Sequence, residues 1–183
     1  MEKGYIIRQA KLLDLDEIAN LEKLCFPKEE AASKSAFFER LSVYANHFWL
    51  LEKDGHIISM VNGMVTDDND LHDEMYHNPE LHNEQGKWQM IFGVETHPKY
   101  QHKGYAAILL KKMIEDAKLH NRSGVVLTCK EHLIHYYEKF GFENEGISGS
   151  EHGGVVWHQM RLKLSGKYSN MKEKAVSDKE QEK

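Results

Sequence analysis

A turn with the pattern Gln-x-x-Gly-x-Ala lies at Gln101, Gly104 and Ala106, between a predicted strand and a long amphipathic helix. The first amides of a helix have no acceptor inside the helix, and the helix dipole places positive charge behind them. Gly104 removes the side chain where an anion must approach the backbone, Ala106 adds only a methyl group, and Lys103 can add charge. This spacing indicates a binding site for a diphosphate.

Two commoner phosphate-binding loops do not occur in the sequence. A Walker loop would read Gly-x-x-x-x-Gly-Lys-Ser/Thr, and a dinucleotide fold would read Gly-x-Gly-x-x-Gly after the first strand. Three fixed residues within six are also common in ordinary strand-to-helix turns. A purely structural turn is therefore the alternative to a phosphate site.

From Glu95 to Phe142 the sequence resembles the GNAT superfamily of acetyl-CoA-dependent N-acetyltransferases, in which a Gln/Arg-x-x-Gly-x-Gly/Ala turn holds the pyrophosphate of coenzyme A. Residues 127–142 look like a strand and helix of the arylalkylamine N-acetyltransferase branch, which has a Cys at the strand end and a Tyr eight residues later. These are Cys129 and Tyr137 here. Residues 24–32 are also similar to this group, and the resemblance is looser over residues 1–92.

The resemblance implies an α/β (α+β) GNAT fold, with a central mixed, mostly antiparallel sheet that is splayed between its fourth and fifth strands and flanked by about four helices. It implies transfer of the acetyl group of acetyl-CoA to a primary amine by direct attack in a ternary complex, with a small arylalkylamine or polyamine as acceptor. A protein or peptide N-acetyltransferase and a non-catalytic coenzyme A sensor are the alternatives.

In the GNAT pattern, the strand carrying residues 93–96 separates from the strand carrying residues 125–129, and the pantetheine arm fills the gap like an added strand. The amide of Val94 is then the expected donor to the thioester carbonyl. A bulge at Gly93 that merely relieves the sheet is the alternative. The residues expected to bind acetyl-CoA are Val94, Glu95, Thr96, Gln101, His102, Lys103, Gly104, Tyr105, Ala106, Ala107 and Tyr137.

Tyr137 is the candidate general acid that protonates the departing thiolate. A free phenol has a pKa of about 10 and a thiol about 8.5, so position rather than acidity must make the phenol effective. Adjacent helix positions face about 100° apart, so Tyr136 and Tyr137 cannot both point at the sulfur, and the family resemblance selects Tyr137. An aromatic core residue is the alternative.

The general base is expected to be Glu95. The animal arylalkylamine enzymes have two histidines at the positions of Met90 and Phe92, so that pair is missing here. Many other GNAT enzymes use a carboxylate near Glu95 that acts through water. Such a carboxylate must be partly desolvated to accept a proton from an amine. A solvated charge at the strand end is the alternative, and His97 is expected to be structural.

Residues 67–84 contain seven acids, three histidines and no Lys or Arg. Near the pocket, such a segment would attract cationic amines, and a solvated surface insertion is the alternative. His72, His77 and His82 recur every five residues, which would place them on different sides of a helix. We therefore expect no metal site.

Composition indicates one domain. The 183 residues are 40% hydrophobic, so residues 1–165 can bury a core without metals or disulfides. Residues 166–183 hold five lysines and four acids, and we expect a disordered tail. The two cysteines lack metal-ligand spacing and the start lacks a signal peptide, which favours the cytoplasm and no membrane. A net charge of -5 opposes nucleic-acid binding, and a monomer or homodimer is possible.

The hydrophobic pattern predicts the following elements. We expect strands at 5–9, 88–95, 125–129 and 156–164, and a hairpin of 47–52 and 56–61 around Asp54-Gly55. Helices are expected at 15–24, capped by Asp14 or Asp16, and at 33–44 and 133–140. A further helix follows Gly104, and its buried stripe is Ala106, Leu110, Met113 and Ala117.

Overall fold

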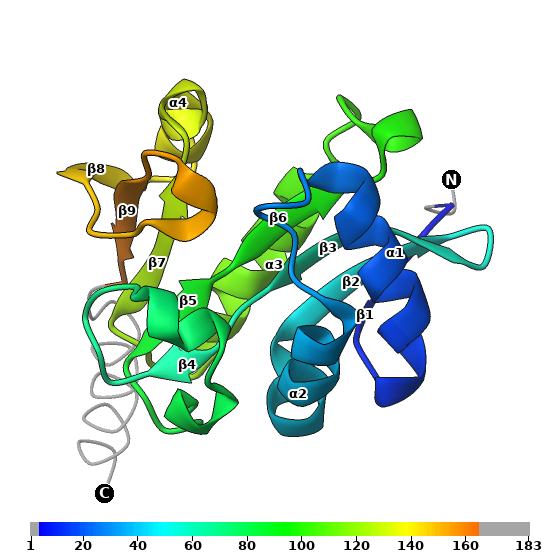
Figure 1. Ribbon diagram of the computed structural model, residues 1–183, viewed down its shortest axis with the longest axis horizontal. Coiled ribbons are helices and arrows are strands. Elements are labelled where there is room, and N and C mark those ends of the chain that lie inside the picture. The colour runs from blue at the N-terminus through cyan, green and yellow to red at the C-terminus, as the bar shows by residue number, and fades with distance from the viewer. Residues whose placement is uncertain (1–3, 165–183) are drawn as a thin grey trace, which may run out of the picture.

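The computed structural model describes residues 4–164. It contains two sheets, which lie side by side in the middle of the molecule (Figure 1). The first sheet has the order β1 (Ile6–Gln9), β2 (Phe48–Lys53), β3 (His56–Asn62) and β6 (Gly93–Thr96). The second has the order β4 (Val65–Thr66), β5 (Trp88–Ile91), β7 (Gly124–Cys129), β9 (His158–Lys163) and β8 (Glu143–Ile147). Only β5 and β7 pair in parallel among these strands, so the predicted mixed, mostly antiparallel architecture is confirmed. The tail expected from residue 166 lies outside the described residues.

Four α-helices flank the sheets in the described part of the chain: α1 (Leu15–Cys25), α2 (Lys34–Tyr44), α3 (Tyr105–Leu119) and α4 (Ile134–Glu138). Apolar residues of α1 and α2, such as Ile18 and Phe37, are buried in one core cluster, whereas Leu109 and Met113 of α3 are buried in another. The two clusters lie on opposite faces, because alternate residues of a strand point to opposite sides. The loops that connect strands and helices at the ends of the sheets can form a site.

Local signals explain most helix and turn boundaries. Ser33 caps α2 by accepting a hydrogen bond from the Ala36 amide at 3.1 Å. The hairpin turn at Asp54 and Gly55 has φ angles of 51° and 78°, as a tight two-residue turn requires. The predicted cap of α1 is wrong in one respect: the Asp14 side chain accepts from the Lys11 amide and from Arg8, and bonds no amide of α1.

The strand predicted over residues 88–95 is in fact two strands in two sheets. The amide of Phe92 donates to the carbonyl of Asn62 at 2.7 Å, although Asn62 is the register partner of Gly93. Two residues of one strand therefore oppose a single residue of the other, which is a β-bulge that bends the ribbon. As a result β5 stays beside β7, while β6 continues beside β3 (Figure 1).

The predicted splay is confirmed and lies between β6 and β7. Pairing between β5 and β7 runs from Trp88 with Gly124 to Ile91 with Leu127, and β6 pairs with β3 alone. The His97 amide bonds the Ile58 carbonyl at 2.8 Å. Because antiparallel hydrogen bonds alternate along a strand, the backbone groups of Val94 and Thr96 face away from β3 and toward the gap.

Three further differences separate prediction and structure. The helix expected at 133–140 is confined to α4 and is preceded by a 3-10 turn at Glu131–Leu133. The short strands β4 and β8 were not predicted, since β8 carries exposed polar residues without an apolar alternation. In α3, Leu110, Met113 and Ala117 are fully buried as expected, whereas Ala106 is only partly buried in the first turn.

Candidate active site

The turn before α3 presents open backbone amides. His102 and Gly104 have φ angles of 62° and 81°, which turn the chain sharply into the helix. The first amide of this region with a backbone acceptor is that of Ile108, which bonds the Gly104 carbonyl at 3.1 Å. Within the described residues, the amides of residues 102–107 have no acceptor. The turn therefore matches the geometry expected of a diphosphate site.

The remaining residues expected to bind acetyl-CoA lie along the turn and β6, but several use their side chains elsewhere. The Gln101 side chain donates to the Thr96 carbonyl at 3.1 Å and so fixes the turn against β6. The Thr96 hydroxyl lies 2.9 Å from the Ser59 hydroxyl. The Tyr105 ring packs edge-to-face on Tyr5, with ring centroids 5.9 Å apart. These residues can contact an anion through backbone groups only, whereas His102 and Lys103 are exposed beside the amides.

Tyr137 lies in the core cluster that also contains Val94 and Cys129, on the α3 side of the sheet. Its ring packs edge-to-face against Tyr136 and Phe142, and its hydroxyl has no hydrogen-bond partner among the described residues. Burial, reinforced by Tyr136 and Cys129, raises the pKa of Tyr137. The phenol therefore carries its proton throughout the neutral range and can offer it.

Glu95 is buried, with 3% of its surface exposed, so it is not a solvated charge at a strand end. Burial and the neighbouring carboxyl group of Glu22 raise the pKa of Glu95 well above its ordinary value, and the Cys25 thiol adds to the shift while Arg40 opposes it. The desolvation that a carboxylate base for amines requires is present. The side chain points toward α1 and α2 because its register partner Met60 belongs to that core cluster.

A cavity of about 250 Å³ opens beside this pair of carboxyl groups. It lies among the α1–α2 connection, the bulge before β6, the end of β7 and the segment before β9. Its walls include six aromatic or imidazole rings and three charged side chains: Phe26, Tyr76, His77, Phe92, His152 and Trp157, with Glu22, Glu30 and Arg40. Sequence reasoning had placed none of these residues in the site.

One of the three charges in the cavity wall has an ion-pair partner, and Arg40 is held by neutral groups, with its Nε left without an acceptor among the described residues. The Glu30 carboxylate lies 2.7 Å from the Lys130 ammonium. The Arg40 guanidinium lies 5.0 Å from the ring centroid of Phe92 and donates to the Tyr76 carbonyl at 3.1 Å. Glu22 accepts a hydrogen bond from the Ala32 amide at 3.0 Å with one oxygen, and its other oxygen is buried without a hydrogen-bond donor. The free carboxylate oxygen of the cavity wall therefore belongs to Glu22.

Comparison with known proteins agrees with this geometry. Residues 15–142 match the acetyltransferase (GNAT) family. The chain belongs to this family. This GNAT chain is similar in fold to the loading GNATL domain of CurA from Lyngbya majuscula, with a TM-score of 0.75, 18% identity, and coverage of 87% of this chain and 97% of that one. It is also similar to the ribosomal-protein-S18-alanine N-acetyltransferase from Escherichia coli (TM-score 0.65, 16% identity, 89% and 97% covered). A third similar structure is the PaiA N-acetyltransferase from Thermoplasma acidophilum in complex with coenzyme A (TM-score 0.65, 15% identity, 87% and 99% covered).

Over residues 4–164, no helix of the GNAT chain is long and apolar enough to cross a membrane.

The acidic segment of this GNAT chain borders the cavity, but its carboxylates do not. Only Tyr76 and His77 from residues 67–84 line the cavity. Asp70 pairs with Arg161 at 2.5 Å, and Asp73 accepts from the Glu151 amide at 2.9 Å. The segment is not one helix but contains 3-10 turns at Asp73–Tyr76 and Pro79–Leu81. Its acids hold loops in place, so the expectation that they would draw amines into the pocket is not supported by their positions.

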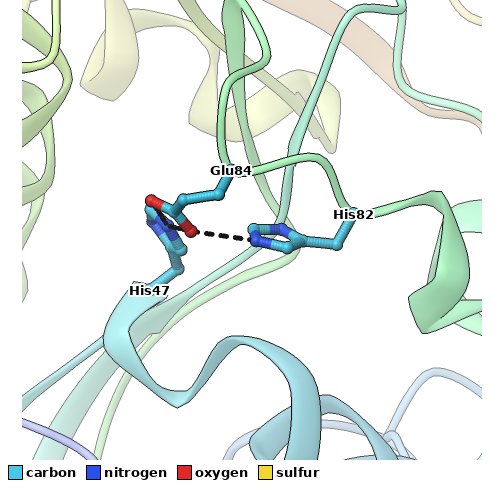
Figure 2. A group of neighbouring side chains, drawn as sticks. All are labelled: His47, His82 and Glu84. Atoms are coloured by element: carbon cyan, nitrogen blue, oxygen red, sulfur yellow. Dashed lines mark hydrogen bonds and ion pairs between the residues drawn. The ribbon is translucent and has the colours of Figure 1, made fainter.

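His82 of this segment meets His47 and Glu84 rather than His72 or His77 (Figure 2). His47 Nε2 lies 2.9 Å and His82 Nε2 lies 3.0 Å from the Glu84 carboxylate. The Val65 amide donates to His82 Nδ1 at 3.1 Å, so the proton of a neutral His82 ring sits on Nε2 and points at Glu84. A metal ion at this place would compete with that proton.

The contacts of His47 complete the assignment of protons. Gln89 donates both amide hydrogens to the carbonyls of Met64 and Met90, so its oxygen accepts from His47 Nδ1 at 3.0 Å. Arg122 adds a donor 3.3 Å from Glu84. Although partial burial alone would raise the pKa of Glu84, hydrogen bonding and charge from His47, with further bonds from His82 and Asn46, lower it to about 2. This arrangement favours a hydrogen-bonded support for the acidic segment over a metal centre.

Replacing Glu84 with Gln is expected to reduce the free energy of unfolding at pH 7 by about 1–2 kcal/mol, the range of a partly screened charged hydrogen bond. Because the pKa of Glu84 is lowered by folding, its contribution is present above the unfolded value near 4.5 and is lost as the pH falls toward about 2. Urea unfolding of the two proteins at pH 7 and pH 3 measures this. The exposed Glu80→Gln in the same segment is the control. A destabilisation independent of pH would show that charge is not the cause.

Proposed function

We propose that this GNAT enzyme acetylates a small primary amine bearing an aromatic group, by direct attack of the amine on acetyl-CoA in a ternary complex. The observation that carries the proposal is the aromatic cavity of about 250 Å³ at the splay of β6 and β7. The open amides of residues 102–107 suit the diphosphate, and the backbone of Val94 faces the gap that suits the pantetheine arm. The cavity then lies where the thioester would end.

The chemistry follows from the two sides of this gap. The Val94 amide would stabilise the oxyanion that forms on the thioester carbonyl, because it points into the gap with no strand opposite it. Tyr137, on the other side, would protonate or hydrogen-bond the departing sulfur. Cys129 and Tyr137 stand where the arylalkylamine branch has its own Cys and Tyr, which supports this reading. The buried carboxyl groups of Glu22 and Glu95 would take up a proton from the amine.

The walls of the cavity favour an arylalkylamine over a polyamine. A polyamine carries several cationic centres along a flexible chain and needs several free carboxylates. Here Glu30 is already paired with Lys130, which leaves Glu22 as the free carboxylate of the wall. Rings of Tyr76 and His152 are stacked with centroids 4.9 Å apart and present flat apolar surface instead.

The rim of the cavity favours a small acceptor over a peptide. His152 Nε2 lies 2.9 Å from the Glu30 carbonyl, and a Cβ on Gly153 would come within 2.7 Å of the Glu30 side chain. These contacts join the α1–α2 connection to the segment before β9 on one side of the cavity. A peptide substrate needs room for the residues that follow its terminal amine. A protein acceptor, which the relative from Escherichia coli acts on by name, is therefore the second candidate.

Measurement of thiol release from acetyl-CoA with a panel of acceptors tests the proposal. Arylalkylamines should give the highest kcat/KM, ahead of polyamines and of peptides with a free amino terminus. If peptides gave the highest kcat/KM, the acceptor would be a peptide or protein and not an arylalkylamine. Tight acetyl-CoA binding with no turnover above hydrolysis on any acceptor would instead favour the sensor.

Trp157→Ala is expected to raise the KM for an arylalkylamine about tenfold, because a ring contact in a cavity is worth about 1 kcal/mol or more. The KM for acetyl-CoA should stay the same, since Trp157 lines the cavity and lies apart from the turn at residues 102–107. Steady-state kinetics with each substrate varied in turn measures both values. The exposed neighbour Val156→Ala is the control. Equal KM values for the amine would remove Trp157 from the acceptor site.

A further inference from the structure

Two buried carboxyl groups from distant parts of the sequence lie close to each other at the wall of the cavity. Glu22 of α1 is 6% exposed and Glu95 of β6 is 3% exposed. Glu22 is close enough to Glu95 to reinforce the effect of burial and raise the pKa of Glu95. Apart from the Ala32 amide, which donates to Glu22, their oxygens have no donor among the described residues. Two neighbouring carboxylates repel each other, so that such a pair takes up a first proton more readily than a lone carboxylate does.

The two members of the pair have different access to the cavity. Glu22 lines the cavity, together with Phe92 and Gly93 from the bulge. Glu95 follows the bulge by two residues on β6, is buried, and is absent from the lining. An acceptor in the cavity can therefore contact Glu22, whereas Glu95 can reach it only through Glu22. In place of the water molecule that the family resemblance implied between Glu95 and the amine, the cavity wall offers the carboxyl group of Glu22.

The other charged and titratable groups around the pair leave its charge available. From α1, the Cys25 thiol donates to the Thr96 carbonyl, and burial with the nearby Glu22 raises its pKa to about 11, so that it stays neutral. From α2, the charge of Arg40 acts on Glu95 and partly opposes the rise of its pKa, while the guanidinium donates to the Tyr76 carbonyl and its Nε has no acceptor among the described residues. On β3, the Ser59 hydroxyl is bonded to the Glu95 carbonyl and to Thr96.

We propose that Glu22 is the catalytic base that takes a proton from the ammonium group of the acceptor, and that Glu95 is a positioning residue that shares this proton. The inference rests on the proposed amine acetylation and deepens it. Glu22 was not among the residues that the sequence placed in the site.

One proton moves from the ammonium nitrogen to the free oxygen of Glu22, and the nitrogen lone pair then forms the C–N bond to the acyl carbon. As the C–S bond breaks, its electron pair leaves on sulfur. The second nitrogen proton is matched by the proton that Tyr137 delivers to the thiolate and regains through solvent. The products are an amide, coenzyme A as the thiol, and one proton that Glu22 releases to water.

Glu95 offers a second position for the proton that Glu22 takes from the amine. Burial and the neighbouring Glu22 raise the pKa of Glu95. A proton that passes from Glu22 to Glu95 is therefore held more tightly than on an isolated glutamate with a pKa of about 4.3, which narrows the difference in pKa from an amine near 10. This is the property that the reaction requires of its base.

Glu22→Gln tests the proposal, because Gln keeps the acceptor for the Ala32 amide and the volume of the side chain. For an arylalkylamine that is protonated at pH 7, kcat/KM should fall about 10²-fold, the low end of general-base effects. For a β,β-difluorinated analogue, which is largely neutral at the same pH, most of this loss should disappear. The affinity for acetyl-CoA should be unchanged. Glu39→Gln on the exposed face of α2 is the matched control.

Glu95→Gln provides a second arm that holds even if Glu22→Gln does not fold. Because the partner that strengthens the base is then uncharged, the acid limb of the pH profile of kcat/KM should move to lower pH with the arylalkylamine. An equal loss with charged and neutral amines, or an unmoved acid limb in Glu95→Gln, would overturn the assignment while amine acetylation stands. A wild-type enzyme that acetylates no amine would overturn the proposed function itself.

Discussion

Replacing Gly104 with Asp is expected to weaken acetyl-CoA binding by at least about 10²-fold. The open amides of residues 102–107 surround this position, so a carboxylate there would stand against the diphosphate. Two unit charges 4 Å apart repel by about 4 kcal/mol at an effective dielectric constant of 20, and exposure of the turn reduces this value. Isothermal titration of the folded variant with acetyl-CoA measures the loss.

Gly104→Asn separates charge from backbone strain. Gly104 has a φ angle of 81°, and Asn and Asp tolerate the left-handed region better than other side chains. The two variants have nearly the same shape, so the difference in affinity between them reports the charge alone. Equal affinities for the Asp and Asn variants would mean that the phosphates bind elsewhere on the protein.

Signals confined to a few neighbouring residues predicted much of the fold. Asp54-Gly55 between two apolar runs identified the first hairpin, and Ser33 marked the start of α2. The break at Phe92 could not be predicted in this way. The apolar pattern runs through Phe92 without interruption, and the bulge exists because Asn62, thirty residues earlier, accepts the amide of Phe92. Pairing with a distant strand decides where one strand ends and the next begins.

The residues of the candidate site likewise fall into those that local sequence patterns predict and those that depend on distant contacts. The turn at Gln101 to Ala106 and the residue Tyr137 are short local patterns, and in the structure the turn connects β6 to α3 while Tyr137 lies on α4 after β7. The cavity is built from six separate segments, at residues 22–40, 62, 76–77, 92–93, 128 and 152–157, which sequence spacing does not bring together. One signal was nevertheless available. Glu22 lies four residues after Ile18 on α1, so a carboxyl group occupies the buried face of an amphipathic helix.

Arg40 shows the same signal on α2. It lies three residues after Phe37 and one before Leu41, within the buried stripe of the helix, and it is 4% exposed. Buried charges are rarely placed without a partner, because desolvation costs several kcal/mol. A search of predicted amphipathic helices for charged residues on the apolar face would have pointed to both Glu22 and Arg40. Neither residue could be assigned to the cavity until the topology was known.

Tyr137→Phe is expected to lower kcat by about 10²-fold or more, within the range of a lost general acid. The hydroxyl of Tyr137 has no hydrogen-bond partner among the described residues, and its removal leaves the ring contacts with Tyr136 and Phe142 intact. The free energy of unfolding should therefore be unchanged or slightly higher, and the affinity for acetyl-CoA should not change. Steady-state kinetics, titration with acetyl-CoA and urea unfolding together measure the three quantities.

Tyr136→Phe is the control that distinguishes position from chemistry. Tyr136 is adjacent in sequence and its ring lies 5.1 Å from that of Tyr137, but it is only half-buried and packs toward Phe140. If the phenol of Tyr137 acts on the departing sulfur, the loss of kcat should occur in the Tyr137 variant alone. The loss should also shrink with an acetyl thioester whose thiol is more acidic, because its thiolate leaves without help. An unchanged kcat in Tyr137→Phe would show that Tyr137 is a core residue and that the thiolate takes its proton from another group.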